Sequence, residues 1–483
     1  MTELDQRGAV HGVFWTAMQS VGVRLFSLVV FIVLARLLTP SDFGLLAMAG
    51  VFVALGDALV SQGLGSAITQ RREIEPAHES TAFWTSVLLG CGLGGALWLT
   101  APFIAALYGQ GELTHVIRWL SPVLPLRGAV GIPVGLLQRR FQFRALALRS
   151  LFAALAGGVA GVVAALAGWG VYALVVQQLV GATLDVLVVW SAAAWWPRLE
   201  FSIRHLKDLT AFSAYLLGSG LFGLFSRRAD DFVIGLVLGE AALGIYAVAY
   251  RGLQILEQVL AKTGSAVAFT AFSRLQDQPE RMLNAFYEST RAATVVTMPV
   301  FLGVAVLAPV AVPLIFGDRY AQSGDVLQVL ALIGLIHGVS YFDHAALTAA
   351  GRTDLVLKLS AVNTVANVVI FFMVARWGIV AVAAAYVVRA YVLMPLNLVA
   401  LRSAIGVSPG RYLANFVPAL ASCLPMALAM WVILQIDLGD VGRLLVSIPL
   451  GVIAYLATLW WLAPALVRDL LSKLTLLLRA KSV

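Results

Sequence analysis

Residues 35–49 read ARLLTPSDFGLLAMA, and residues 235–249 read GLVLGEAALGIYAVA, an offset of 200. The identical positions are Leu38, Gly44, Ala47 and Ala49 in the first stretch and Leu238, Gly244, Ala247 and Ala249 in the second. A second match pairs GWGVYALVV, from Gly168, with RWGIVAVAA, from Arg376, at an offset of 208. Leu, Ala and Gly are common residues, so each match alone is weak. Their nearly constant offset predicts an internal repeat of about 200 residues.

The composition places this repeat in a membrane. Hydrophobic residues make up 60% of the 483, and charged residues only 12%. Apolar runs of about 20 residues recur along the chain, long enough to cross about 30 Å of hydrocarbon as helices. Helix satisfies every backbone polar group within one segment, as lipid requires. The sequence therefore predicts an all-α integral membrane protein of about fourteen transmembrane helices. The predicted spans are 13–37, 43–65, 82–107, 115–137, 147–168, 171–194, 210–237, 241–266, 283–315, 324–350, 356–376, 379–401, 414–435 and 443–465.

The repeat and the spans together predict the domain organisation. Each repeat holds six spans, an even number, so both enter the membrane in the same orientation and form a parallel repeat. We expect two six-helix lobes with a binding site between them, followed by two C-terminal helices and an amphipathic tail. The predicted boundaries are 1–205 for the N-lobe, 206–405 for the C-lobe, 406–466 for the extra helix pair and 467–483 for the cytoplasmic tail.

The cations of the predicted loops set the expected orientation. If the N-terminus is cytoplasmic, the inward segments carry twenty Lys and Arg residues and the outward loops carry five. By the positive-inside rule this bias predicts that both termini are cytoplasmic. The net charge of +8 does not indicate nucleic-acid binding, because the cations are spread over many loops and form no basic domain.

Several charged residues fall inside the predicted spans, where a charge costs about 2.5–3.5 kcal/mol. Arg24, Arg127 and Arg251 have no acid three or four residues away on the same helix. We expect them to line a water-filled cavity that attracts anions. Arg291 is the fourth candidate, with local pairing to Glu288 as the alternative. Local pairing of Arg227 and Arg228 with Asp230 and Asp231 is the structural alternative for these four residues.

A cavity lined by arginine favours a particular cargo. Guanidinium groups bind phosphate oxygens through paired hydrogen bonds, which favours an amphiphile with an anionic headgroup. A multidrug cation antiporter of the same fold is one alternative, but it requires acids to dominate the cavity. A polytopic polysaccharide polymerase or glycosyltransferase is another, but the outward loops are short. The sequence shows no metal-ligand cluster, nucleophile motif or phosphate loop, so we expect a transporter without a cofactor, not an enzyme.

Four stretches resemble a known family. They are RLLTPSDFGLLAMAGVF from Arg36, QGLGSAITQRREI from Gln62, QRRFQFRALALRS from Gln138, and GWGVYALV from Gly168. Together they resemble the polysaccharide-export branch of the multidrug/oligosaccharidyl-lipid/polysaccharide flippase superfamily, closest to its Wzx-type and colanic-acid exporters, over about the first 400 residues. The resemblance implies alternating access by two lobes in the bacterial inner membrane. It also implies that the cargo is an oligosaccharide on undecaprenyl pyrophosphate, which is flipped from the cytoplasmic to the periplasmic leaflet. The implied partner is the machinery that assembles exopolysaccharide or lipopolysaccharide.

The resemblance also implies roles for individual residues. Arg24 matches a substrate-recognising arginine of the first helix in related flippases, and Arg251 is similar to a basic residue of the eighth. The implied coupling or gating residues, which would respond to a proton or sodium ion, are Asp57, Glu257, Asp230, Asp231, Asn363 and Asn367. A sodium site at Asp231, Asn363 and Asn367 departs from the family pattern, because Asn367 stands where an acid is expected. The alternative for the two asparagines is interhelical hydrogen bonding.

Overall fold

The computed structural model describes residues 22–61, 64–70, 74–260, 262–469 and 472. Within these ranges it does not describe the side chains of 66–67, 70, 207–227, 259, 262–267 and 339. Within this part of the chain, twelve helices are long and apolar enough to cross a membrane. The predicted class, an all-α multi-pass membrane protein, is confirmed. The count of fourteen stays a prediction, because the first predicted span lies partly outside the described residues. The predicted tail at 467–483 lies largely outside them as well.

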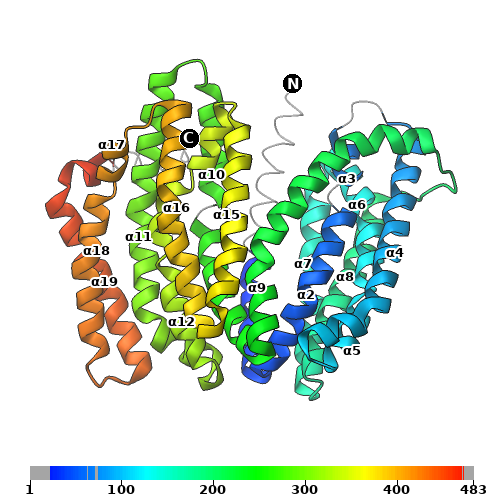
Figure 1. The fold of residues 1–483 in the computed structure, drawn as a ribbon, viewed down its shortest axis with the longest axis horizontal. Coiled ribbons are helices and arrows are strands. Elements are labelled where there is room, and N and C mark those ends of the chain that lie inside the picture. Colours follow the sequence, from blue (N-terminus) through cyan, green and yellow to red (C-terminus); the bar gives the residue numbers. More distant parts are fainter. Residues whose placement is uncertain (1–21, 62–63, 71–73, 261, 470–471, 473–483) are drawn as a thin grey trace. The chain divides into compact units, whose positions relative to one another are not determined.

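The structure divides into two compact units, residues 1–244 and 245–483. The first unit begins with a helix over 22–37. It continues with α2 (Pro40–Ser61), α3 (Leu64–Gln70), α4 (Pro76–Tyr108), α5 (Glu112–Leu120), α6 (Val123–Arg139), α7 (Phe143–Leu166), α8 (Val171–Ala193) and most of α9 (Ile203–Leu260). Within this unit α7 packs on α8, and α6 packs on both α4 and α8 (Figure 1).

The second unit contains the C-terminal end of α9 and ten further α-helices. They are α10 (Lys262–Arg274), α11 (Pro279–Phe316), α12 (Ala321–Ala331), α13 (Gly334–Ser340), α14 (Asp343–Ala349), α15 (Thr353–Val374), α16 (Ile379–Ile405), α17 (Pro409–Ala414), α18 (Val417–Leu434) and α19 (Gly439–Leu462), with 3₁₀ turns η1 (Asp318–Tyr320) and η2 (Ala375–Trp377). The predicted extra pair corresponds to α17, α18 and α19. Helix α18 packs on α11 and α19, so this pair belongs to the second unit.

The fourth and tenth predicted spans are broken helices. The span predicted at 115–137 is divided between α5 and α6 at Ser121 and Pro122. Proline has no backbone N–H to continue the helical hydrogen bonds, which accounts for the break. The span predicted at 324–350 is divided into α12, α13 and α14. These two spans hold the same place in the predicted repeats, six spans apart.

Helix α9 accounts for the difference between the predicted lobe boundary at 205 and the observed boundary at 244. It is a continuous helix except at Gly239, where φ is 84° and ψ is −177°. The predicted spans 210–237 and 241–266 meet at this break. The segment before it packs on the first unit, since the rings of Phe232 and Tyr108 are 6.0 Å apart and edge-on. Residues up to Gly244 therefore group with the first unit.

Two glycines of the predicted repeat allow a close helix crossing. A Cβ atom on Gly44 of α2 would overlap the carbonyl oxygen of Glu240, and one on Gly244 would overlap that of Pro40. Gly244 is the counterpart of Gly44 in the predicted repeat. Each glycine thus lies against the backbone carbonyl of the residue four positions before its counterpart. The amide of Gln110 donates a hydrogen bond to the carboxylate of Glu240 beside this crossing. The absence of side chains at both glycines is therefore a requirement of the packing.

We predict that Gly44→Ala destabilises the protein by about 1–3 kcal/mol or more, because the added methyl group forces the two backbones apart. Thermal unfolding of the detergent-solubilised chain measures the effect. Gly50→Ala is the matched control, since it lies on the same helix and its Cβ would meet nothing within 4 Å. Equal unfolding temperatures for the two variants would contradict the tight crossing.

Candidate substrate-binding site

Four charged side chains from four helices meet inside the first unit. We call Asp57 of α2, Arg127 of α6, Arg149 of α7 and Asp185 of α8 the Arg127 network. Arg127 lies 3.9 Å from an oxygen of Asp57 and 3.6 Å from an oxygen of Asp185. Arg149 lies 3.1 Å from the other oxygen of Asp185. The network holds two cations and two anions, so its formal charge is zero.

The two arginines of the network differ in contact and exposure. The Arg149 side chain is 17% exposed and forms an ion pair of 3.1 Å with Asp185, which is itself 9% exposed. The Arg127 side chain is 43% exposed, and both of its ion pairs are longer than a hydrogen bond. Arg149 is therefore a structural partner of Asp185. Arg127 has guanidinium N–H groups that solvent or a ligand can reach.

Acids from other helices reach Arg127. The sequence excludes an acid on the same helix turn, but Asp57 and Asp185 reach Arg127 from α2 and α8. Arg149 lies inside α7 and pairs with Asp185 of α8, a contact that the sequence does not predict. Apolar spacing along one chain segment carries no signal for such contacts between helices.

The other predicted substrate-binding arginines lie on separate helices. Arg24 is on the helix over 22–37 and is exposed. Arg251, near the C-terminal end of α9, and Arg291, on α11, are both half-buried and belong to the second unit. Their role in substrate binding remains a prediction.

The predicted coupling acids fall into two environments. Asp230 and Asp231 are buried, and a carboxylate oxygen of Asp231 lies 2.7 Å from Arg228, as the local spacing predicts. Glu257 instead lies 2.8 Å from Nδ1 of His337, which belongs to α13. Both side chains of this second pair are about a quarter exposed. Both groups of the Glu257–His337 pair are therefore accessible to water. Nothing in the order of residues predicts this pair, because the two residues lie on different helices.

The asparagine pair is engaged in protein contacts. The side-chain oxygen of Asn363 accepts a hydrogen bond of 3.1 Å from Arg389, whose guanidinium also lies 5.1 Å from the ring of Tyr386. A cation beside Asn363 would meet the positive charge of Arg389. This contact argues against the sodium site and supports the alternative, an interhelical hydrogen bond between α15 and α16. Asn367 is buried on α15.

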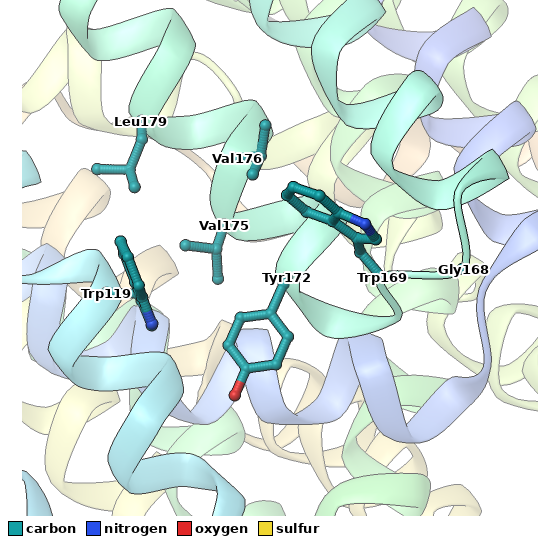
Figure 2. A pocket seen from close by; sticks show the side chains of 7 residues that line it. All are labelled: Trp119, Gly168, Trp169, Tyr172, Val175, Val176 and Leu179. Carbon is teal, nitrogen blue, oxygen red and sulfur yellow. The ribbon is translucent and has the colours of Figure 1, made fainter.

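An apolar pocket of about 590 Å³ lies elsewhere in the first unit, between α5 and α8. Figure 2 shows the rings of Trp119, Trp169 and Tyr172 around it, with Val175 and Leu179 along one side. The lining residues carry no charge. The pocket suits a hydrocarbon chain, and it does not include any residue of the Arg127 network.

Comparison with solved structures defines the class of fold. The chain matches the lipid II flippase MurJ in its inward closed conformation with a TM-score of 0.77, covering 94% of this chain and 100% of that one at 13% identity. It matches an inward-facing multidrug resistance MATE family transporter with a TM-score of 0.61, covering 83% of this chain and 94% of that one at 17% identity. The protein thus has the helical fold shared by these transporters.

Sequence comparison identifies the family. The family described as polysaccharide biosynthesis protein matches residues 33–325, more than half of the chain, and the chain belongs to this family. The succinoglycan biosynthesis transport protein ExoT of Rhizobium meliloti is 29% identical over 68% of this chain and 67% of its own length. The lipopolysaccharide biosynthesis protein WzxC of Escherichia coli is 28% identical over 74% of this chain and 73% of its own length. The expected polysaccharide-export branch of the flippase superfamily is confirmed.

We predict that Asp185→Asn destabilises the protein far more than Asp57→Asn. Removing Asp185 leaves Arg149 shielded without its partner, at a cost of about 3–5 kcal/mol. Asp57 is 39% exposed and 3.9 Å from Arg127, so its loss costs about 0–1 kcal/mol. Unfolding of both purified variants in the same detergent provides the comparison. Similar losses of stability would show that Arg149 and Asp185 do not anchor the network.

Proposed function

We propose that this protein is a flippase that moves a lipid-linked oligosaccharide from the cytoplasmic to the periplasmic leaflet of the bacterial inner membrane by alternating access. Membership of the polysaccharide biosynthesis family is the observation that carries this proposal. The names of the relatives support it, since ExoT is a biosynthesis transport protein and MurJ a lipid II flippase. The proposed cargo is linked to undecaprenyl pyrophosphate, and both termini are proposed to be cytoplasmic.

Arg127 is the proposed first contact of the pyrophosphate. Its long pair with Asp57 is weak because the side chains are about two-fifths exposed and screened by water. A pyrophosphate offers oxygens for paired, charge-assisted hydrogen bonds, which are stronger than a distant ion pair. The cargo can therefore replace Asp57 at Arg127 while Asp185 stays bound to Arg149. We propose Arg24, Arg251 and Arg291 as the further substrate-binding residues.

The membrane potential assists the outward step. Moving two negative charges across an inside-negative membrane of 100 mV releases about 4.6 kcal/mol. Resetting the empty carrier is the step for which we propose proton coupling. Glu257 with His337 is the proposed coupling pair, because the carboxylate and the imidazole contact each other and both are partly exposed. Asp57, Asp230 and Asp231 are the remaining coupling or gating candidates.

We predict that Arg127→Ala lowers polysaccharide export about 10- to 100-fold, which corresponds to the loss of charge-assisted hydrogen bonds worth about 1.5–3 kcal/mol. The measurement is surface polysaccharide in a deletion strain that carries the variant, with protein abundance determined by immunoblot. Arg127→Lys keeps the charge but loses the bidentate geometry, so its export is expected to lie between that of Arg127→Ala and that of the unaltered chain. The exposed Arg376→Ala is the matched control and keeps full export.

The same strains test the proposed cargo. Intact-mass analysis of the deletion strain is expected to show accumulated prenyl-pyrophosphate oligosaccharide, which disappears on complementation with the unaltered chain. Full export by Arg127→Ala at normal abundance would refute the role of Arg127. Absence of any accumulated lipid-linked saccharide, together with efflux of lipophilic cations, would instead favour the multidrug antiporter.

We predict that Glu257→Gln lowers gradient-driven flipping about 5- to 150-fold, the factor that corresponds to typical coupling free energies of about 1–3 kcal/mol. The amide cannot exchange a proton with His337 at neutral pH. The assay is flipping of a fluorescent lipid-linked saccharide in proteoliposomes with an imposed proton gradient. Glu280→Gln, at an exposed acid in the first turn of α11, serves as the control. Unchanged gradient dependence in Glu257→Gln would remove this pair from the coupling step.

A further inference from the structure

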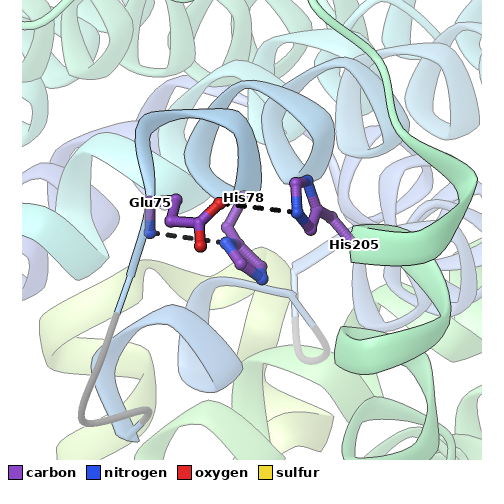
Figure 3. A group of neighbouring side chains, drawn as sticks. All are labelled: Glu75, His78 and His205. Atoms are coloured by element: carbon purple, nitrogen blue, oxygen red, sulfur yellow. Dashed lines mark hydrogen bonds and ion pairs between the residues drawn. The ribbon is translucent and has the colours of Figure 1, made fainter.

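Three potential metal ligands meet where α4 and α9 begin. Glu75 caps the N-terminus of α4, His78 lies in its first turn, and His205 lies in the first turn of α9. One ligand atom from each residue lies within 4.8 Å of the others. Figure 3 shows the two imidazole rings and the carboxylate converging from the two helices. The sequence does not reveal this grouping, because His78 and His205 are 127 positions apart.

The spacing of these atoms is close to that of a metal site. An oxygen of Glu75 lies 3.6 Å from Nε2 of His205, and the two imidazole rings are 4.0 Å apart with an angle of 34° between their planes. A tetrahedral ion with ligand bonds of about 2.0–2.2 Å holds its ligand atoms about 3.3–3.6 Å apart. The carboxylate oxygen of Glu75 and Nε2 of His205 lie at the upper end of this range.

The exposure of the three groups gives the site one open side. His78 is 5% exposed and the His205 side chain 18%, while the Glu75 side chain is 71% exposed. The imidazoles thus form the floor of the site and the carboxylate its rim. An ion can enter from water, and with three protein ligands it would keep a fourth position for a water molecule.

The backbone around the site is held in place. The segment between α8 and α9 runs along α4, where Arg198 N–H donates to the Ser80 hydroxyl over 3.0 Å and Ser202 N–H to that of Thr81 over 3.1 Å. The indole of Trp84 donates to the carbonyl of Arg198 over 2.8 Å. Both hydroxyl residues are buried. His205, three residues after Ser202, is therefore presented to α4 by a fixed backbone, as a preorganised site requires.

Simpler structural roles explain part of this arrangement. Nδ1 of His78 accepts a hydrogen bond of 3.3 Å from the backbone N–H of Glu75, which closes a capping box, and Glu75 forms an ion pair with His205. Neither contact requires the two imidazole rings to lie together. A bound ion would account for the convergence of the two rings beside the carboxylate.

We propose that Glu75, His78 and His205 bind one divalent transition-metal ion of the Zn²⁺ class. Two imidazole nitrogens and one carboxylate oxygen suit Zn²⁺ and similar borderline cations, whereas Mg²⁺ and Ca²⁺ prefer oxygen ligands throughout. The ion would join the beginning of α4 to the beginning of α9. It would thereby fix the segment between the first six predicted spans and the spans that follow.

The test uses the full-length chain, purified through a tag without histidine and stripped with a chelator. Co²⁺ is the spectroscopic probe and Zn²⁺ the competitor. We expect one Co²⁺ per chain with the visible bands of four-coordinate cobalt, loss of these bands on addition of Zn²⁺, and a higher unfolding temperature with Zn²⁺ than with Mg²⁺. Glu75→Gln, at the exposed rim, is expected to bind at least about tenfold more weakly, and His205→Ala weaker still.

His115→Ala provides the matched control, since His115 lies on α5 outside the cluster and is exposed. It is expected to bind Co²⁺ like the unaltered chain. Less than one Co²⁺ per chain in the unaltered protein would overturn the proposal. Equal affinity in the unaltered chain, Glu75→Gln and His205→Ala would also overturn it, whether or not the protein flips lipid, because binding is measured without transport.

Discussion

A charged side chain inside a membrane span must find its counter-charge within the protein, because hydrocarbon offers none. Asp185 of α8 meets this requirement for two arginines at once. It binds Arg149 of α7 at 3.1 Å and also faces Arg127 of α6. These three helices pack on one another, so the ion pairs and the helix contacts support the same arrangement. The position of Arg127, and any access of a ligand to it, depends on this anchor.

The charged groups of the two units divide into closed and open pairs. Arg149 with Asp185, and Arg389 with Asn363, involve side chains that are largely shielded and serve the fold. Arg127 with Asp57, and Glu257 with His337, are partly exposed. A transporter has to exchange partners in each cycle, and exchange requires pairs that water and cargo can reach. The exposure of the open pairs therefore supports the roles proposed for them in cargo recognition and coupling.

The beginning of α4 shows a second kind of polar contact within the first unit. The buried hydroxyls of Ser80 and Thr81 and the indole of Trp84 form hydrogen bonds with the segment between α8 and α9. His205, just after this segment, lies beside His78 and Glu75. The first unit thus uses hydrogen bonds at this helix end and ion pairs within the Arg127 network.

The order of residues is enough to predict the class of this protein, most of its membrane spans, its family and a local pairing among residues 227–231. These properties depend on apolar length and on neighbours a few residues apart, which the order of residues contains directly. The folded structure is needed to see that Asp57 and Asp185 meet Arg127, that Glu257 meets His337, and that His78 meets His205. Each of these contacts joins different helices. They depend on which helix faces pack together, and long apolar helices that look alike in sequence do not specify that choice locally.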